Sequence, residues 1–376
     1  MQKIYLYLEN GTYLEANSFG ATGTCVGEIV FNTSMTGYQE ITSDPSYAGQ
    51  FITFTMPEIG NVGVNPDDME STKVHCKGVL VRTYHKKYSN YRGKKCYDEL
   101  LKEHNVLGIC DIDTRYLTKM LRNEGAMMMI ASTEIKDKNE LAKILEKSPR
   151  IEDINYIKEV TTKESYIHKL GAWNHKVQEY SKAMMSDKKI LVVDFGVKRN
   201  ILNELVEAGL EVEVISADFK AKDLIKRFED KEIGGIFLSN GPGDPLTLSE
   251  EKSELKKLIN TKIPIFGICL GHQLLSIAHG YDTFKLKFGQ HGANHPVFND
   301  KKTVEITAQN HNYNVPEAIE KIAKITHLNL FDETIEGVKY LNKNIFSVQH
   351  HPEASPGPHE SKYIFKEFAD LVHAIK

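Results

Sequence analysis

The sequence predicts an α/β protein in which an N-terminal α+β domain precedes a domain with a mostly parallel β-sheet flanked by helices. Two observations lead to this fold class. Short apolar runs alternate with helical patterns throughout the second half, whereas the first half offers short strands and few helices. The chain of 376 residues, 41% of them hydrophobic, is also long enough for two domains with separate cores.

Alternating strand and helix patterns begin at Lys189. Apolar runs typical of strands buried on both faces predict strands at 190–194, 212–215, 236–238 and 263–266. Helical patterns between these runs cover 200–208, 221–229 and 249–259. This order predicts parallel strands joined by helices on both faces of the sheet, with ligand sites beyond the carboxyl ends of the strands.

The first half predicts shorter elements and a separate domain. Strand patterns lie at 28–31, 51–54 and 79–81, and helical patterns lie at 97–104 and 114–122. A polar stretch, 165–187, contains the single tryptophan, Trp173, and has no clear period. We therefore expect a domain at 1–150, a linker at 151–187 and a second domain at 188–376.

Composition and charge argue against several classes of partner. A net charge of −4 lacks the excess of basic residues expected of a protein that binds nucleic acid or an anionic membrane surface. No apolar run approaches the roughly 20 residues of a membrane span, and the N-terminus lacks the apolar stretch of a signal peptide. The five cysteines form no C-x-x-C pair, which disfavours disulfides and structural zinc. We expect a cytoplasmic protein that binds neither nucleic acid nor membrane.

A cysteine between two glycines, in the run 267–273 (G-I-C-L-G-H-Q), follows a predicted strand and precedes a helical pattern. This arrangement is typical of a nucleophile elbow, in which the glycines allow a sharp turn and a close approach of backbone or substrate. The positive end of the following helix favours the thiolate of Cys269, and the N–H of Leu270 can donate to an oxyanion. The alternative is a buried structural cysteine, which is the commoner role in apolar surroundings.

A further strand pattern, 345–349, leads into the run His350, His351, Pro352 and Glu353. Side chains two residues apart in an extended segment point the same way, so Glu353 can hold one nitrogen of His351. The other nitrogen is then free to take a proton from a thiol and return it to a leaving amine. The alternative is a loop histidine beside a solvated glutamate, and the adjacent His350 is a competitor for the base role.

A third motif follows the strand 235–239 and has the sequence N-G-P-G-D-P at 240–245. Two glycines and two prolines prevent a continued strand or helix, so the chain must turn sharply and expose backbone N–H groups. Such a loop can complete an oxyanion hole, in which one donor is typically worth about 3 kcal/mol. The alternative is an ordinary surface turn.

These three motifs, in this order, resemble those of the class I glutamine amidotransferases. The first half resembles the small chains of carbamoyl-phosphate synthase at 31–40 (F-N-T-S-M-T-G-Y-Q-E), 44–47 (D-P-S-Y) and 111–115 (D-I-D-T-R). The resemblance covers nearly the whole chain and implies a small-chain domain followed by a glutamine amidotransferase domain. It further implies that Cys269 is the nucleophile, His351 the general base and acid, and Glu353 its orienting partner.

The resemblance also implies a glutamine-binding site. Its residues match Ser46, Gly241, Gly243, Leu270, Gln273, Asn310, Asn312 and Tyr313. Asn312 stands where many relatives have glycine, and Tyr313 stands where some have phenylalanine. Asparagine tolerates a left-handed backbone, so the turn expected there can survive, while the role of the Asn312 side chain stays open. The family's spacing to Glu353 favours His351 over His350 as the base.

The implied activity is hydrolysis of glutamine to glutamate and ammonia. The ammonia would pass through a tunnel to a separate large chain, which makes carbamoyl phosphate from bicarbonate and ATP for arginine and pyrimidine synthesis. This partnership implies a heterodimer. The alternatives are the glutaminase subunit of another class I amidotransferase and a non-catalytic regulatory subunit.

We expect no cofactor in this chain, and we expect ATP and Mg on the large chain. The sequence has no G-x-x-x-x-G-K-[ST] loop, and Gly196 and Lys198 are more simply part of a strand-to-helix turn. Histidines are numerous, but no H-E-x-x-H pattern accompanies them. We therefore expect no bound metal.

Overall fold

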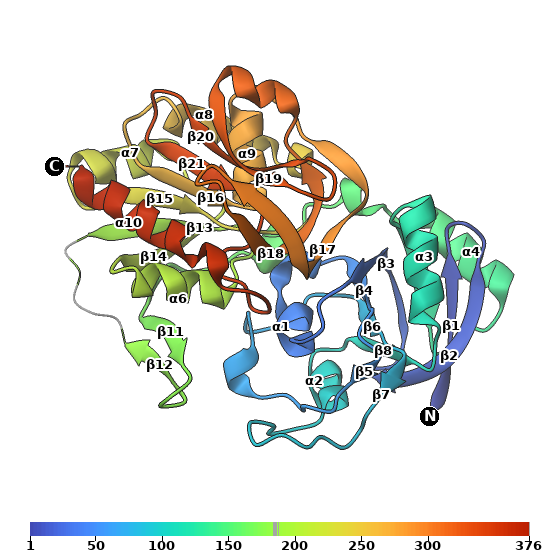
Figure 1. Ribbon diagram of the computed structural model, residues 1–376. Helices are drawn as coiled ribbons and strands as arrows, with labels where there is room; N and C mark the ends of the chain where they lie inside the picture. The colour runs from blue at the N-terminus through green and yellow to red at the C-terminus, as the bar shows by residue number, and fades with distance from the viewer. Residues whose placement is uncertain (183–185, 187, 376) are drawn as a thin grey trace. The chain divides into compact units, whose positions relative to one another are not determined.

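The computed structural model describes residues 1–182, 186 and 188–375 (Figure 1). These residues form two compact units, 1–156 with 286–292, and 157–285 with 293–376. The predicted linker at 151–187 contains the short helix α5 (Ile157–Val160) and three strands, while 183–185 and 187 lie outside the described residues. The domain boundaries at 150 and 187 stay predictions.

The first unit is built on a closed barrel with the strand order β1-β2-β8-β6-β4-β3-β9. Its strands are β1 (Gln2–Leu8), β2 (Tyr13–Gly20), β3 (Thr24–Asn32), β4 (Gln50–Phe54), β6 (Gly78–Leu80), β8 (Leu107–Cys110) and β9 (Met127–Ser132). Strands β3, β4, β6 and β8 run parallel, and the remaining neighbours run antiparallel. Because the barrel closes, none of these strands is left with an unpaired edge.

Helices and a small ribbon complete the first unit. They are α1 (Tyr38–Ser43), α2 (Tyr97–Glu103), α3 (Thr114–Glu124), α4 (Lys138–Lys147), and the paired strands β5 (Glu58–Ile59) and β7 (Thr83–Tyr84). The side chains of Asp113 and Asp137 cap the first turns of α3 and α4. This combination of a barrel and helices is the α+β domain that the sequence predicts.

The second unit is built on a ten-stranded sheet with the order β10-β14-β13-β15-β16-β21-β20-β19-β17-β18. Its strands are β10 (Tyr166–His168), β13 (Lys189–Asp194), β14 (Glu211–Ser216), β15 (Gly235–Leu238), β16 (Ile265–Ile268), β17 (Phe284–Asn299), β18 (Val304–Asn314), β19 (Ala323–Asn329), β20 (Ile335–Tyr340) and β21 (Ile345–Val348). The part of β17 at 286–292 belongs to the first unit. The five strands β14, β13, β15, β16 and β21 are parallel, and β10, β20 and β19 extend them antiparallel. A separate ribbon pairs β11 (Leu170–Asn174) with β12 (Glu179–Lys182).

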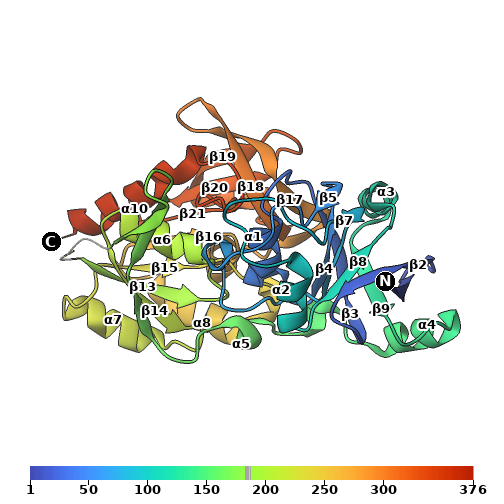
Figure 2. The ribbon, with the colours of Figure 1, turned by 90° about the horizontal axis from the view of Figure 1, so that it is seen from below.

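Helices cover both faces of the parallel strands. They are α6 (Arg199–Glu207), α7 (Ala221–Glu229), α8 (Ser249–Leu258), α9 (Leu270–Ala278) and α10 (Tyr363–Ala374). Figure 2 shows α6 and α10 on one side of the sheet and α7 and α8 on the other. Successive strand residues join opposite cores, since Leu191 and Val193 pack with α7, α8 and α9, whereas Ile190 and Val192 pack with α6 and α10.

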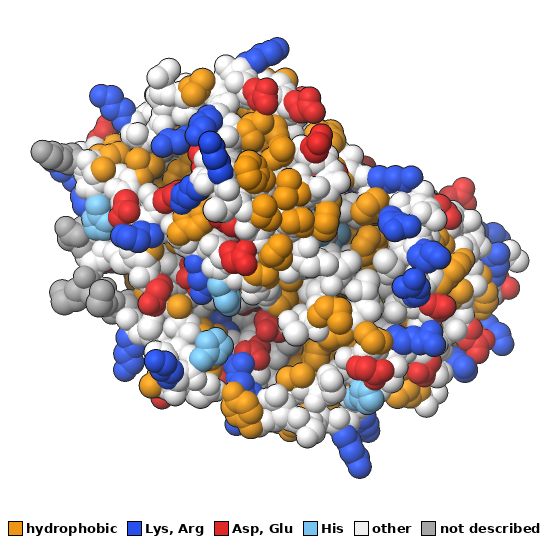
Figure 3. Space-filling view, viewed as in Figure 1, with side chains coloured by type: hydrophobic (Ala, Val, Ile, Leu, Met, Phe, Trp, Pro, Cys, Tyr) orange, Lys and Arg blue, Asp and Glu red, His pale blue; other side chains and the backbone are white. Residues whose placement is uncertain are grey.

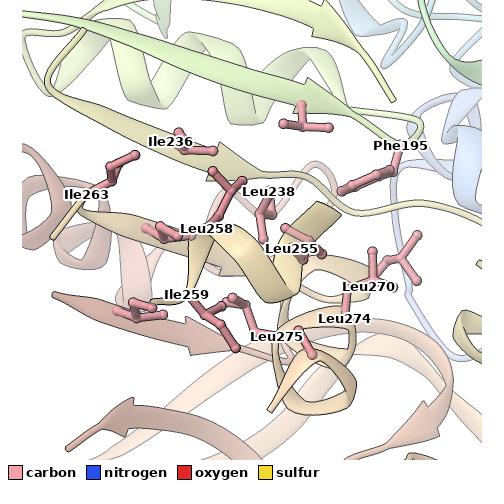
Figure 4. Packing of buried hydrophobic residues seen from close by; sticks show 14 of the residues in the cluster. Phe195, Ile236, Leu238, Leu255, Leu258, Ile259, Ile263, Leu270, Leu274 and Leu275 are labelled. Atoms are coloured by element: carbon pink, nitrogen blue, oxygen red, sulfur yellow. The ribbon is translucent and has the colours of Figure 1, made fainter. Parts of the chain in front are cut away.

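The core beneath α8 and α9 holds the start of α9 in place. Figure 4 shows Leu255 and Leu258 of α8 packed with Ile236 and Leu238 of β15, and Leu270 and Leu274 of α9 in the same cluster. Burying each such side chain stabilises the fold by about 1.5–3 kcal/mol. Leu270 directly follows Cys269, so this packing also fixes the residue after the predicted nucleophile.

The molecular surface carries mixed charges. Figure 3 shows hydrophobic side chains grouped over β17 and β19, with charged side chains of both signs around them. Phe298, Leu330 and Phe331 are among the exposed large apolar residues. Within the described ranges, no helix is both long enough and apolar enough to cross a membrane.

Candidate active site

The three sequence motifs follow neighbouring parallel strands of the second unit. The loop 240–245 follows β15, Cys269 follows β16, and His351 comes shortly after β21. These strands are adjacent in the order β15-β16-β21, with Leu238 paired to Gly267 and Ile268 paired to Val348. Because parallel strands end at one edge of a sheet, the motifs meet there, as expected for an α/β ligand site.

Cys269 stands at a strained bend between β16 and α9. Its backbone has φ 52° and ψ −103°, a positive-φ conformation outside the regions that a non-glycine residue ordinarily adopts, which costs on the order of 1–3 kcal/mol. The N–H of Cys269 donates to the carbonyl of Val348 at 2.9 Å, and the residue is only 2% exposed. The bend therefore has the geometry that the nucleophile elbow requires.

The flanking glycines provide space for this bend. A Cβ on Gly267 would lie 2.7 Å from the backbone of Gly271, and a Cβ on Gly271 would lie 2.3 Å from the carbonyl oxygen of Leu238. Neither glycine is among the described residues with positive φ. Close packing, rather than an unusual backbone angle, is therefore what requires glycine at both positions.

His351 and Glu353 form a buried pair just beyond β21. Nδ1 of His351 lies 2.7 Å from Oε1 of Glu353, and the backbone N–H of His351 donates to the carbonyl of Ala308 at 2.9 Å. Nε2 of His351 is buried and has no hydrogen-bond partner among the described residues. This is the nitrogen that is available to exchange a proton.

The pKa of His351 depends on both Glu353 and Cys269. Burial lowers the pKa of the imidazole, but the Glu353 carboxylate and the Cys269 thiol outweigh burial and raise this pKa to about 10. The thiol itself donates to the carbonyl of Asn310 at 3.5 Å, so the described side chains of Cys269 and His351 share no hydrogen bond of normal geometry. Catalytic hydrogen bonds of this kind often tighten only when substrate binds.

Lys198 is a site residue that the sequence analysis missed. Its Nζ lies 3.0 Å from Oε1 of Glu353 and also donates to the carbonyl of Ala354, and the side chain is nearly fully buried. Burial raises the pKa of Glu353, but Lys198 and then His351 lower it to about 2. The interpretation of Lys198 as part of a simple turn was therefore incomplete. The turn after β13 also places the buried ammonium group of Lys198 beside Glu353.

Asn200 and Asn240 support the same arrangement. Nδ2 of Asn200 donates to the carbonyl of Glu353 at 2.6 Å, and the N–H of Lys198 donates to Oδ1 of Asn240 at 3.1 Å. Lys198 stands four residues after the end of β13, and its place in the turn that leaves the strand was the available signal. Without the fold, that lysine is indistinguishable from a surface charge.

The loop 240–245 packs against the cysteine elbow. A Cβ on Gly241 would lie 2.3 Å from the carbonyl oxygen of Phe195 and 2.8 Å from Cδ2 of Leu270, so only glycine fits there. Gly243 has φ 88°, which glycine adopts without strain. Asp244 accepts from the N–H of Leu246 at 2.9 Å and thereby fixes the end of the loop.

The remaining residues predicted to bind glutamine are distributed over both units. In the second unit, Asn310, Asn312 and Tyr313 lie on β18, and Nε2 of Gln273 donates to the carbonyl of Tyr313 at 2.8 Å. In the first unit, the buried Ser46 lies in a 3-10 turn, where its N–H donates to Asp44 at 2.9 Å. The glutamine-binding roles of all eight residues stay predictions.

The expectation of a left-handed turn at Asn312 is wrong. Asn312 lies within β18 (Val304–Asn314) and is not among the described residues with positive φ. An extended strand accepts any side chain, so the backbone at this position does not require glycine.

His350 contacts a different set of groups from His351. It is fully buried, its ring centroid lies 5.2 Å from that of His327, and its Nδ1 lies 3.8 Å from Oε2 of Glu336. The carboxylate of Glu353 bonds to His351 instead. This pairing supports His351 as the candidate base.

The fold and this site define a class I glutamine amidotransferase domain, and residues 191–371 match the family described as glutamine amidotransferase class-I. Residues 6–131 match the domain described as carbamoyl-phosphate synthase small chain, CPSase domain. The chain belongs to the carbamoyl phosphate synthase small chain family.

Full-length relatives support this assignment. The chain is 58% identical to the carbamoyl phosphate synthase small chain of Campylobacter jejuni, over 98% of this chain and 100% of that protein. It is 58% identical to the small chain of Helicobacter hepaticus, over 99% of this chain and 98% of that protein. It is 46% identical to the small chain of Escherichia coli, over 99% of this chain and 97% of that protein. The similarity therefore spans both units.

Proposed function

We propose that this chain hydrolyses the side-chain amide of glutamine, with Cys269 as nucleophile, His351 as general base and acid, and Glu353 as its orienting carboxylate. The observation that carries the proposal is the buried His351–Glu353 pair, 2.7 Å apart, at the end of the strand next to Cys269. Membership in the carbamoyl phosphate synthase small chain family supports glutamine as the substrate.

The reaction begins with the Cys269 proton already on His351, because the raised pKa of the imidazole keeps it protonated at neutral pH. The thiolate attacks the amide carbon of glutamine and forms a tetrahedral intermediate. His351 then protonates the leaving nitrogen, and ammonia departs as the C–N bond breaks. A water molecule, deprotonated by His351, attacks the glutamyl thioester, and glutamate and the thiol are released.

Backbone groups near the elbow would stabilise the oxyanion. Leu270 is the first residue of α9, so its N–H lies at the positive end of the helix dipole, which favours negative charge. Gly241 packs directly against Leu270. Each such donor typically contributes about 3 kcal/mol to transition-state stabilisation. Lys198 would keep Glu353 ionised through the cycle, so that Nδ1 of His351 always faces a carboxylate.

The relatives are named small chains, which supports a separate large chain as the partner of this one in a heterodimer. In this scheme the ammonia passes to the large chain, which carries the ATP and Mg and makes carbamoyl phosphate for arginine and pyrimidine synthesis. We propose a cytoplasmic location, because the five cysteines are all free thiols, as expected in a reducing compartment.

The test uses the chain assembled with its large chain and compares glutamine with free ammonia as the nitrogen source. Cys269→Ala is expected to abolish glutamine-dependent synthesis and to retain ammonia-dependent synthesis. Cys110→Ala is the matched control, because Cys110 is also buried but lies in the barrel of the first unit.

A second measurement uses a glutamine-like electrophile, which should label Cys269 and leave Cys110 unmodified. Retained glutamine-dependent activity in Cys269→Ala would overturn the nucleophile assignment. If the wild type lacks glutaminase activity with and without the large chain, the alternative of a regulatory subunit would replace the proposal.

A further inference from the structure

A second group of ligand-type side chains lies in the second unit and uses none of the three proposed catalytic residues. One ligand atom each from Glu305, His327 and His350 lies within 4.8 Å of the others, and all three residues are buried. They come from β18, from β19 and from the segment that follows β21. The fold thus gathers two imidazoles and a carboxylate from three separate parts of the sheet.

His350 is the member of this group that lacks partners. The residue is fully buried, and neither ring nitrogen has a hydrogen-bond partner among the described residues. The nearby Oε2 of Glu336 is also buried and unpartnered, and its distance of 3.8 Å from Nδ1 is too long for a hydrogen bond. Burying such groups without partners costs free energy, and an additional polar or charged group bound between them would offset this cost.

Glu305 is already held in a fixed orientation. Its two carboxylate oxygens accept from Nδ2 of Asn299 at 2.5 Å and from Oγ of Ser361 at 2.6 Å. Each oxygen retains a further lone pair, because a carboxylate offers about four acceptor positions. Outer contacts of this kind are what orient ligands in metal sites.

His327 is oriented in the same way. Its Nδ1 lies 2.9 Å from Oγ1 of Thr326, and its Nε2 lies 3.2 Å from the hydroxyl of Tyr363. If the Nδ1 proton is donated to Thr326, Nε2 is the ligand atom, and the ion would replace its contact with the Tyr363 hydroxyl. His327 borders a cavity of about 510 Å³ that Tyr363 and Asp300 also line.

We propose that Glu305, His327 and His350 bind one divalent transition-metal ion of the Zn²⁺ type. Two imidazoles and a carboxylate form a nitrogen and oxygen ligand set that Zn²⁺ and its neighbours prefer over Mg²⁺ or Ca²⁺. In a tetrahedral site the ligand atoms lie about 3.4 Å apart, so binding would draw these three side chains together and leave the fourth position to a water molecule. The buried carboxylate of Glu336 balances the charge of the ion beside His350.

The bound ion would act on structure rather than on the reacting atoms. It would join β18 and β19 to the segment after β21, and this segment also carries His351. The sequence gives no spacing motif for the site, because its ligands are spread from residue 305 to residue 350. This explains why the sequence analysis expected no metal.

The experiment is a titration of the purified, chelator-treated full chain with Co²⁺ alone. We expect saturation at one Co²⁺ per chain, with visible absorption bands of a four- or five-coordinate site that Zn²⁺ abolishes by displacement. Glu305→Gln and His350→Gln should each weaken binding by at least about tenfold. His373→Gln on α10 is the matched control, because this histidine is exposed and lies outside the group.

Thermal unfolding with and without Zn²⁺ gives a second readout, and its result is separate from the glutaminase activity. The wild type and His373→Gln should be stabilised by the ion, whereas Glu305→Gln and His350→Gln should not. Wild-type protein that binds neither Co²⁺ nor Zn²⁺ saturably would overturn the proposal and leave the direct approach of His350 to Glu336 as the explanation of the cluster. Equal binding by the wild type and both variants would overturn it as well, since the ligands would then lie elsewhere.

Discussion

The ammonium group of Lys198 lies 3.0 Å from the carboxylate of Glu353, and both side chains are buried although they are 155 residues apart in the sequence. This contact joins the turn after β13 to the segment after β21. It neutralises the carboxylate that faces His351, so the candidate base is supported by two residues rather than one.

Replacing Lys198 by methionine should therefore damage both stability and activity. The change keeps the length of the side chain but leaves the charge of Glu353 buried without its cation, so the pKa of Glu353 should rise from about 2. Removing one partner of a buried pair typically lowers the free energy of unfolding by about 3–5 kcal/mol. Loss of a correctly held base should lower kcat/KM for glutamine by on the order of 10².

The matched control for this variant is Lys189→Met. Nζ of Lys189 lies 3.1 Å from Glu211, but both side chains are partly exposed, so the loss should be below about 1 kcal/mol. Urea unfolding and glutaminase kinetics provide the two measurements. Equal stability of the two variants, together with unchanged kinetics in Lys198→Met, would show that Lys198 does not support Glu353.

Lys198 also marks the limit of what the sequence could predict. The parallel strands β13, β14, β15, β16 and β21 and the helices α6 to α9 follow from apolar runs and helical periodicity, and the three motifs follow from their places at strand ends. The antiparallel strands β17 to β20 and the helix α10 were not predicted. A buried lysine has no such local signal, because its role depends on two strands that are not neighbours in the sheet. For the same reason, the closure of the first-unit barrel and the group of Glu305, His327 and His350 could not be predicted.

The raised pKa of His351 predicts a specific pH dependence of stability. The imidazole has a pKa of about 10 in the folded chain and an ordinary value of 6.5. Its contribution to stability is therefore fully present below pH 6.5 and is lost as the pH rises toward 10. The difference in free energy of unfolding between the wild type and His351→Gln should shrink over this range.

NMR titration of the His351 ring gives the direct measurement. In Cys269→Ala the pKa of His351 should fall, because the thiol is one of the groups that raise it. Cys76→Ala is the control: burial raises the pKa of that thiol to about 12, so it stays neutral over the range of the titration. A His351 resonance that titrates near pH 6.5 in the wild type would contradict the assignment of a charged pair.

Gly271→Ala tests how tightly the start of α9 is packed beneath Cys269. Alanine ordinarily favours a helix over glycine by about 1 kcal/mol, but here its Cβ would lie 2.3 Å from the carbonyl oxygen of Leu238. The clash should dominate, lower the free energy of unfolding by about 1–3 kcal/mol, and displace the elbow enough to reduce kcat/KM. Gly280→Ala is a useful comparison, since its Cβ would meet nothing within 4 Å while its φ of 93° imposes a strain cost of about 1–2 kcal/mol. Both variants should lose stability, but only Gly271→Ala should lose activity; full activity in a destabilised Gly271→Ala would mean that the elbow tolerates movement of α9.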